Sequence, residues 1–173
     1  MQRRAQPVDQ AILDQSVLFP DGVIASDGGG WSLDGKAVAG DTWPLPAKAW
    51  SHPRSAGTYA RFLRHYVVER KTLSWLDAIA RVSYGPAHLL EDAVPQMRRK
   101  GRIQVGADAD IVILDPARIT DNATYTVPAR TSSGIDYVIV NGQVLVDNGE
   151  LDPGRLPGRA IRNDQPPPSS GDR

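Results

Sequence analysis

The sequence of 173 residues predicts a mixed α/β region followed by a β region. Apolar residues recur at helical spacing up to about residue 95, whereas from Gly101 onward they alternate or form short runs bounded by turn residues. The dipeptide Asn141–Gly142 lies between two apolar runs, which is the strongest short-range signal for a β-hairpin. The 16 Gly and 14 Pro exceed their usual combined share and predict many turns and long loops.

The first elements are a short helix and a short strand. Pro7 suits a first helical turn, and the apolar spacing behind it predicts a helix over about 7–17. After a turn, the apolar run Val23–Ala25 predicts a strand that is buried on both faces. The run ends abruptly at Asp27 and a row of glycines.

A long segment without periodicity follows, from Gly28 to about Ser55. It contains Trp31, Trp43 and Trp50, which offer large surfaces to bury and therefore argue against disorder. Loops of this length inside a compact domain are usually functional. We therefore expect an ordered loop that covers a site.

Two helical patterns come next. An apolar stripe predicts the clearest helix, over about 57–70, while Ser74 and Asp77 resemble a capping box that starts a second helix. Gly85 is expected to end this second helix, and Pro86 to start a short helical turn through Leu90. The stripe consists of Tyr59, Phe62, Leu63, Tyr66 and Val67.

Beyond Pro95 the pattern predicts β structure. Gly101–Gly106 and Asp110–Asp115 are expected as strands, and Tyr137–Val146 as a hairpin. Asn148–Gly149 predicts a further turn.

Composition excludes several classes of protein. Twenty basic and twenty acidic residues give a formal net charge of zero, so we expect no nucleic-acid partner. The absence of cysteine excludes disulfides and thiolate metal ligands. No apolar run approaches the roughly 20 residues that span a bilayer, and Met1–Gln10 carries no export signal. We expect no membrane association, and the compartment is undetermined with the cytoplasm favoured.

Asp27 is the best single candidate for chemistry. A carboxylate directly after a buried strand and before glycines lies where α/β folds build their sites. Gly28 would let substrate and backbone approach closely. The alternative is that Asp27 caps a turn, and the pattern alone leaves both readings open.

His52 and Arg54 flank Pro53 at the end of the long loop. The Arg54 guanidinium could hold a substrate carboxylate through a bidentate fork, although ordinary surface contacts explain an arginine there equally well. His52, His65 and His88 lie too far apart in sequence for a complete zinc site, so any metal would take ligands from elsewhere. Gly28–Gly30 matches neither the P-loop nor the dinucleotide pattern.

The cations in Met97–Arg102 have two interpretations. The run could bind a polyanion, but a solvated linker between two domains is favoured in a neutral chain.

Several strings resemble one family. Gly101–Asp115 is similar to the Gly-x-Ile-x-x-Gly-x-x-Ala-Asp signature of the amidohydrolase superfamily, and Ile135–Gly149 resembles the hairpin that follows it. Leu156–Arg162 resembles the ending of N-acyl-D-amino-acid deacylases. Together with Ala25–Gly28 and Ser51–Tyr59, these strings narrow the resemblance to the deacylase (D-aminoacylase) branch.

The resemblance implies a fold. Residues 1–95 would be the last strand, active-site loop and helices of a metal-dependent-hydrolase (β/α)₈ TIM-like barrel, and 96–163 strands of a small β-sandwich. Residues 164–173, with three consecutive prolines, are expected as a disordered tail. A complete barrel needs about 250 residues. The resemblance therefore implies a missing N-terminal barrel portion, on the same or a separate chain.

The resemblance also implies an activity: hydrolysis of N-acyl-D-amino acids to a carboxylate and a free D-amino acid. Asp27 matches the family's aspartate after the eighth strand, the proton shuttle, and His52, Arg54 and Gly28 would face the substrate. Zinc is implied, with ligands mostly outside this chain. The glycines before Trp31 depart from the usual stretch and leave the side-chain preference open.

Two alternatives stay open. One is a non-catalytic or partner-requiring module without the metal site. The other is an amidohydrolase that acts on dipeptides or cyclic amides, although the Asp-His-Ala-Pro string of dihydroorotases is absent.

Overall fold

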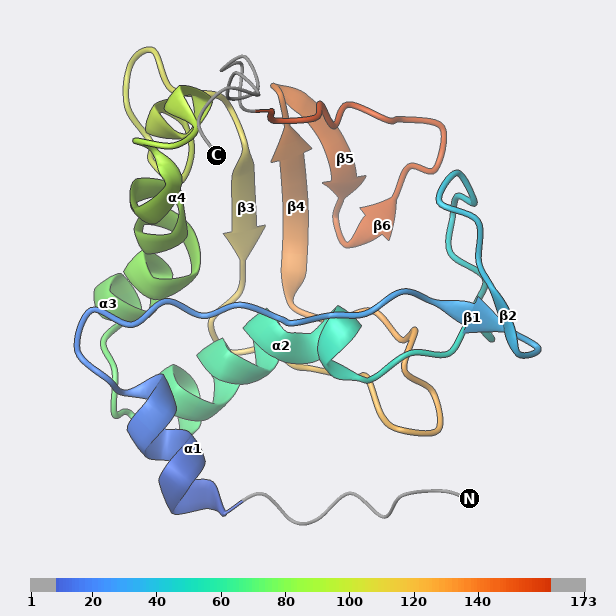
Figure 1. Ribbon diagram of the computed structural model, residues 1–173, viewed down its shortest axis with the longest axis horizontal. Coiled ribbons are helices and arrows are strands. Elements are labelled where there is room, and N and C mark those ends of the chain that lie inside the picture. The colour runs from blue at the N-terminus through green and yellow to red at the C-terminus, as the bar shows by residue number, and fades with distance from the viewer. Residues whose placement is uncertain (1–8, 163–173) are drawn as a thin grey trace, which may run out of the picture.

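The computed structural model describes residues 9–162. Figure 1 shows helices along one side of the molecule, an antiparallel sheet beside them, and an extended segment that crosses the front from α1 to a small hairpin. The helices are α1 (Gln10–Val17), α2 (Arg54–Phe62) with a π-helical extension (Leu63–Glu69), α3 (Trp75–Ile79) with a π-helical extension (Ala80–Tyr84), α4 (Gly85–Leu90) and a 3₁₀ turn (Pro95–Arg99). The strands are β1 (Ser32–Leu33), β2 (Lys36–Ala37), β3 (Ile111–Leu114), β4 (Ile135–Val140), β5 (Gln143–Asp147) and β6 (Glu150–Leu151).

The buried core lies among the helices. The apolar stripe predicted for residues 57–70 is confirmed, because all its members except Tyr59, which is 46% exposed, are buried. Ile119 joins this core from the connection between β3 and β4 and is 1% exposed. The core cluster consists of Ala60, Phe62, Leu63, Tyr66, Val67, Ala78 and Ile119.

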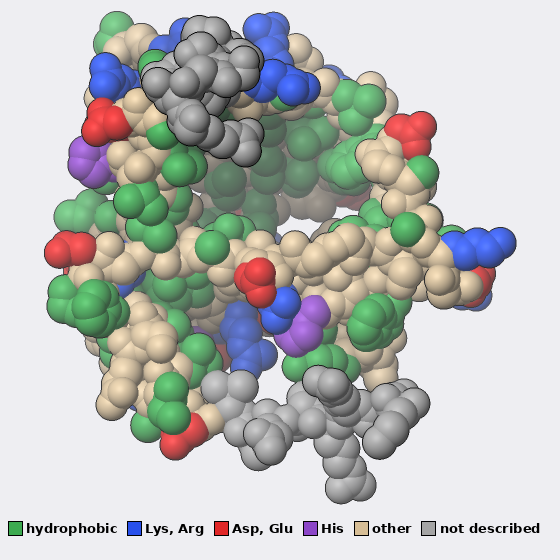
Figure 2. Space-filling view, in the orientation of Figure 1, with side chains coloured by type: hydrophobic (Ala, Val, Ile, Leu, Met, Phe, Trp, Pro, Cys, Tyr) green, Lys and Arg blue, Asp and Glu red, His purple; other side chains and the backbone are tan. Residues whose placement is uncertain are grey.

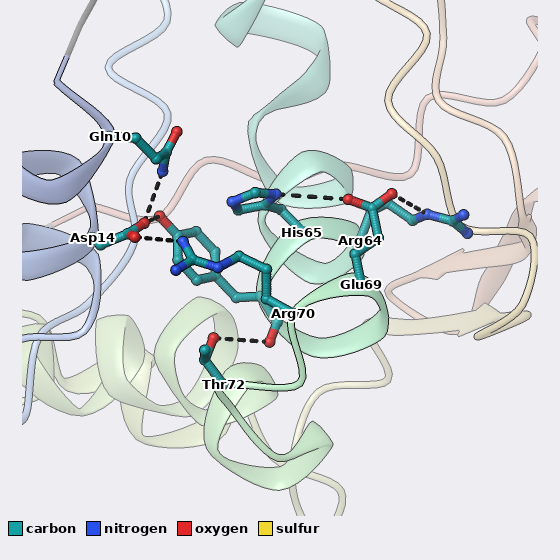
Figure 3. A network of polar contacts seen from close by, with 8 residues as sticks. Gln10, Asp14, Arg64, His65, Glu69, Arg70 and Thr72 are labelled. Carbon is teal, nitrogen blue, oxygen red and sulfur yellow. Dashed lines mark hydrogen bonds and ion pairs between the residues drawn. The ribbon is translucent and has the colours of Figure 1, made fainter.

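A polar network ties α1 to this core (Figure 3). The Asp14 carboxylate accepts hydrogen bonds from Gln10 (2.7 Å) and the Tyr66 hydroxyl (2.8 Å), and it pairs with Arg70. The bond from Arg70 is the largest cause that lowers the pKa of Asp14 to about 2, while burial, followed by the bond to Asp14, raises the pKa of Tyr66 to about 12. The helix predicted over 7–17 is confirmed from Gln10, whereas Pro7 lies outside the described residues.

Gly85 does not end the second helix, as the sequence pattern suggested. Its backbone is right-handed helical, and its N–H bonds the carbonyl of Ala80 in a π-helical turn that leads into α4. A Cβ at Gly85 would lie 3.0 Å from both the Ala80 carbonyl and Val23. Glycine is therefore required for close approach of the 22–24 segment and not as a terminator. The predicted turn from Pro86 to Leu90 is confirmed as part of α4.

The predicted strand Val23–Ala25 is extended but forms no ladder within residues 9–162. One recorded backbone bond, from the Ile24 N–H to the Arg81 carbonyl (3.0 Å), holds it to the helices. Val23 is 38% exposed, so burial on both faces is also wrong for this segment. A buried parallel strand needs neighbours on both sides, and the described residues supply none.

The four-stranded sheet has the order β3-β4-β5-β6, with all neighbours antiparallel. The predicted hairpin is confirmed: Asn141 and Gly142 have φ of 47° and 77°, as a type I′ turn requires. The second predicted turn, Asn148–Gly149, leads into β6.

Of the two strands predicted ahead of this hairpin, Asp110–Asp115 is confirmed as β3 and Gly101–Gly106 is not a strand. Ile103 and Val105 in the latter segment are 88% and 104% exposed. Alternating apolar residues form a strand only when another strand pairs with them, and within residues 9–162 nothing pairs with this segment.

The long loop has defined structure, as predicted. Its hairpin β1–β2 is joined to its end by paired backbone bonds between Ser32 and Trp50 (2.9 and 2.7 Å). The Trp43 indole donates to the Pro153 carbonyl (3.0 Å), which links the loop to the segment after β6. Trp43 and Trp50 remain 45% and 58% exposed, so their surfaces are only partly buried.

Among the described residues, no helix combines the length and the apolar character that a bilayer crossing requires. The tail predicted for residues 164–173 lies outside the described residues.

Candidate functional site

Asp27 ends the extended segment in the left-handed region, with φ of 44°, which aspartate tolerates better than most residues. Its carboxylate is 89% exposed. Arg54, the first residue of α2, contacts Asp27 twice: Nε donates to the backbone carbonyl (2.7 Å) and Nη2 pairs with Oδ2 (3.0 Å). The guanidinium thus fixes both the backbone and the carboxylate of Asp27.

Gly28 lies against the start of α2. A Cβ at this position would be 3.2 Å from Cα and Oγ of Ser55, tighter than ordinary contacts. Its N–H donates to the Ser26 hydroxyl (3.2 Å). Gly28 therefore allows the turn after Asp27 to approach α2, while its predicted contact with substrate stays a prediction.

His52 caps the first turn of α2. Its Nδ1 accepts a hydrogen bond from the Arg54 N–H (3.1 Å), which assigns the ring as neutral with the proton on Nε2. Nε2–H then donates to the Tyr125 hydroxyl oxygen (3.1 Å). The two rings also meet edge to face, with centroids 5.1 Å apart.

Two serines support this arrangement. Ser51 is buried (4% exposed) and its hydroxyl lies 3.0 Å from that of Ser55. The four residues that the sequence singled out, Asp27, Gly28, His52 and Arg54, are thus brought together at the start of α2.

Tyr125 was not predicted from the sequence. It lies 73 residues after His52, in the irregular connection between β3 and β4, and no local pattern marks it. Gly57 of α2 is the indirect signal in the sequence that another segment packs here. A Cβ at Gly57 would be 2.0 Å from Oδ1 of Asp121. The absence of a side chain at Gly57 allows the connection to pack directly on α2.

The three histidines are held separately. His65 pairs with Glu69 (3.6 Å) and His88 with Glu91 (2.8 Å), away from His52. Within residues 9–162, no three His, Asp or Glu side chains are grouped so that they could hold a metal ion. The described residues alone therefore do not fit a zinc site.

The cationic run at 97–102 is neutralised by carboxylates. Lys100 contacts Asp108 (3.0 Å) and Asp110, and Arg102 contacts Glu91 (3.1 Å). These ion pairs argue against a polyanion patch. They also hold the segment to its neighbours more closely than we expected for a solvated linker.

Comparisons with known proteins agree with the motifs. The Amidohydrolase family pattern matches residues 37–146. An N-acyl-D-glutamate deacylase of Alcaligenes xylosoxydans xylosoxydans is 36% identical over 120 residues, which are 69% of this chain and 23% of the relative. An N-acyl-D-aspartate deacylase of the same organism is 32% identical over 154 residues, covering 89% of this chain and 26% of the relative.

Solved structures give the same result. A D-aminoacylase structure matches with a TM-score of 0.69 and 27% identity, over 88% of this chain and 28% of that protein. N-acyl-D-glutamate deacylase from Bordetella bronchiseptica, complexed with zinc and a phosphonate that mimics the tetrahedral intermediate, matches with a TM-score of 0.55 and 35% identity, over 65% and 22%.

The chain thus spans about a quarter of the length of the relatives it matches. Because the family pattern covers more than half of its residues and the curated relatives are deacylases of acylated D-amino acids, the chain belongs to the amidohydrolase family.

Proposed function

We propose that this chain is the C-terminal part of a metal-dependent amidohydrolase that cleaves the amide bond of N-acyl-D-amino acids. The products are a carboxylate and a free D-amino acid. The observation that carries the proposal is the exposed carboxylate of Asp27, held by Arg54 beside His52, in a chain whose relatives are named as deacylases.

Asp27 acts as the proton shuttle. Its Oδ2 pairs with Arg54, and the Asp27 side chain is 89% exposed to solvent. When water attacks the carbonyl carbon, a C–O bond forms and the carboxylate accepts the water proton. When the C–N bond breaks, the carboxylic acid returns that proton to the departing amine nitrogen.

Arg54 recognises the carboxylate of the amino-acid substrate. Nε and Nη2 already contact Asp27, so a substrate carboxylate bound at the other edge of the guanidinium would lie close to the proton shuttle. His52 holds the backbone of Arg54, and Gly28 lets the turn after Asp27 pack against Ser55 at the start of α2.

Zinc is the metal that the family implies, and a bound zinc ion supplies Lewis-acid chemistry. Its ligands would come from outside residues 9–162, because no suitable cluster lies within them. We propose accordingly that 1–95 belong to the catalytic barrel, that 96–163 belong to a β-sandwich, and that the N-terminal barrel portion completes the site from the same or a separate chain.

The test is Asp27→Asn in the full-length protein, assayed with N-acetyl-D-glutamate, N-acetyl-D-aspartate, neutral N-acetyl-D-amino acids, their L-isomers and hydantoin. We expect turnover of a D-substrate in the parent protein and a fall in kcat of about 10²–10⁴ in the variant. Asn tolerates the left-handed backbone, so the fold should be kept. Asp34→Asn is the matched control, since Asp34 lies in the β1–β2 turn with φ of 50°.

Equal turnover of the Asp27 and Asp34 variants would remove Asp27 from the mechanism. Turnover of L-isomers or hydantoin in place of D-substrates would favour a dipeptide or cyclic-amide enzyme. The absence of all turnover in the metal-loaded full-length protein would favour a non-catalytic module.

A further inference from the structure

We propose that Tyr125 is a positioning residue for the substrate-binding end of the long loop: through His52 it holds the first turn of α2, and so the guanidinium of Arg54 beside Asp27. This inference rests on the proposed function. It adds to the site a residue from the β3–β4 connection, a segment that neither the motifs nor the spacing of polar residues identified.

Each hydrogen bond of the His52 ring has a defined direction. The Arg54 N–H can only donate, so Nδ1 of His52 must carry a lone pair at that contact. The neutral ring therefore carries its proton on Nε2 and donates it to the Tyr125 oxygen at 3.1 Å. Tyr125 and Arg54 bind opposite nitrogens of one imidazole, which fixes the orientation of the ring.

His52 is connected to Asp27 through Arg54. Pro53, the residue before α2, makes no side-chain hydrogen bond to the helix, so the His52 imidazole takes the capping role. Arg54 follows at once and makes both contacts to Asp27. A rotation of the His52 ring would release the backbone N–H of the residue that orients Asp27.

Tyr125 reaches His52 from the β3–β4 connection, which packs on α2 at Gly57. The missing side chain of Gly57 lets Asp121 pack on α2, and Oδ1 of Asp121 accepts from the Ala123 N–H (2.8 Å). The connection thus meets α2 at Gly57 and the end of the long loop at His52. Tyr125 itself is 61% exposed, so it contributes little to the buried core.

The first test removes the acceptor for the Nε2 proton. Tyr125→Phe in the full-length protein keeps the ring that packs on His52 but lacks the oxygen. With histidine side chains labelled by ¹⁵N, the Nε2–H resonance of His52 is identified by its loss in His52→Ala. We expect this proton to exchange faster with water, and its resonance to broaden or vanish, in Tyr125→Phe.

Tyr84→Phe is the matched control. Tyr84 also contacts a histidine, stacking on His88 with centroids 5.5 Å apart, but no hydroxyl bond joins the two and neither belongs to the site. An unchanged His52 resonance in Tyr125→Phe would overturn the inference.

The second test measures kinetics with the D-substrate that the parent turns over. Loss of one hydrogen bond of ordinary strength should raise KM about fivefold, because the Arg54 guanidinium that binds the substrate carboxylate is held less firmly. It should change kcat by less than about twofold, because the two contacts from Arg54 to Asp27 are kept. If Tyr125 acts through His52, the Tyr125→Phe/His52→Ala double variant should match His52→Ala. Additive losses, or an unchanged KM in Tyr125→Phe, would contradict the positioning role.

The two tests separate two kinds of failure. A parent protein without turnover, but with the resonance change in Tyr125→Phe, would reject the proposed activity and support the contact between Tyr125 and His52. A parent protein with turnover and no effect of Tyr125→Phe would reject the role of Tyr125 and leave the activity in place.

Discussion

The helices and the four-stranded sheet of this chain bury their apolar residues very differently. The helices place Phe62, Leu63 and Tyr66 at 4–5% exposure in a common core. None of the residues in strands β3 to β6 is buried, and Val112 and Ile113 of β3 are 55% and 48% exposed. Figure 2 shows hydrophobic side chains at the back of a hollow in front of β3 and β4.

This difference shows which part of the chain buries a core of its own. A sheet normally buries at least one face against another layer. The helices bury a common core within the described residues, although Ile12, Leu76 and Leu89 on their outer faces are 62–80% exposed. The sheet and the segment that carries Ile103 and Val105 have no buried residue. The contrast agrees with a chain that spans about a quarter of its relatives, and it supports our proposal that a further barrel portion, on the same or a separate chain, completes the protein.

The largest expected effect tests the contrast directly. Phe62→Ala should lower the free energy of unfolding of the purified chain by about 3–5 kcal/mol, because it leaves a cavity in the helical core. Val112→Ala in β3 should cost less than about 1 kcal/mol, because that side chain is already half exposed. Urea unfolding of both variants measures the two values, and equal losses would show that the sheet is as well packed as the helices.

A smaller effect concerns the contact that links the two parts. Gly57→Ala should lower the free energy of unfolding by about 1 kcal/mol, because the new Cβ would fall 2.0 Å from the Asp121 carboxylate and displace that side chain from α2. Gly29→Ala is the matched control, since no atom lies within 4 Å of a Cβ there. If thermal unfolding found the two variants equally stable, the connection would not be held on α2.

The smallest effect is the pH dependence that Asp14 contributes within the helical part. The folded pKa of Asp14, about 2, is below its ordinary value of 3.8, so its contribution to stability is present above pH 3.8 and is lost as the pH falls towards 2. Asp14→Asn should therefore flatten the stability profile between pH 4 and 2. Asp41→Asn, in the exposed loop, is the control, and identical acid unfolding curves for Asp14→Asn and the parent would exclude this role.

Local sequence patterns were sufficient to predict the segments whose structure depends on contacts within the segment itself. The stripe at 57–70 specified a helix and its buried face, because residues three and four apart share one side of a helix. Asn141–Gly142 specified a hairpin, because both residues accept positive φ. The motifs around Asp27 and Arg54 likewise identified a pair that the structure joins.

Local patterns failed where a segment depends on a neighbour. Val23–Ala25 and Gly101–Gly106 read as strands, but a strand exists only in a ladder, and the described residues offer no partner to either. Gly85 resembles a helix terminator in the sequence, yet its backbone is helical. Its missing side chain makes room for Val23.

The sequence alone determined the family, the helical core and the position of Asp27 at the end of an extended segment, since each depends on residues that are close along the chain. Only the tertiary structure brought Tyr125 to His52 across 73 residues and left the sheet without a buried residue. The physical reason is that a contact between distant segments depends on the path of the backbone between them and on what covers each surface. Neither leaves a periodic pattern in the sequence.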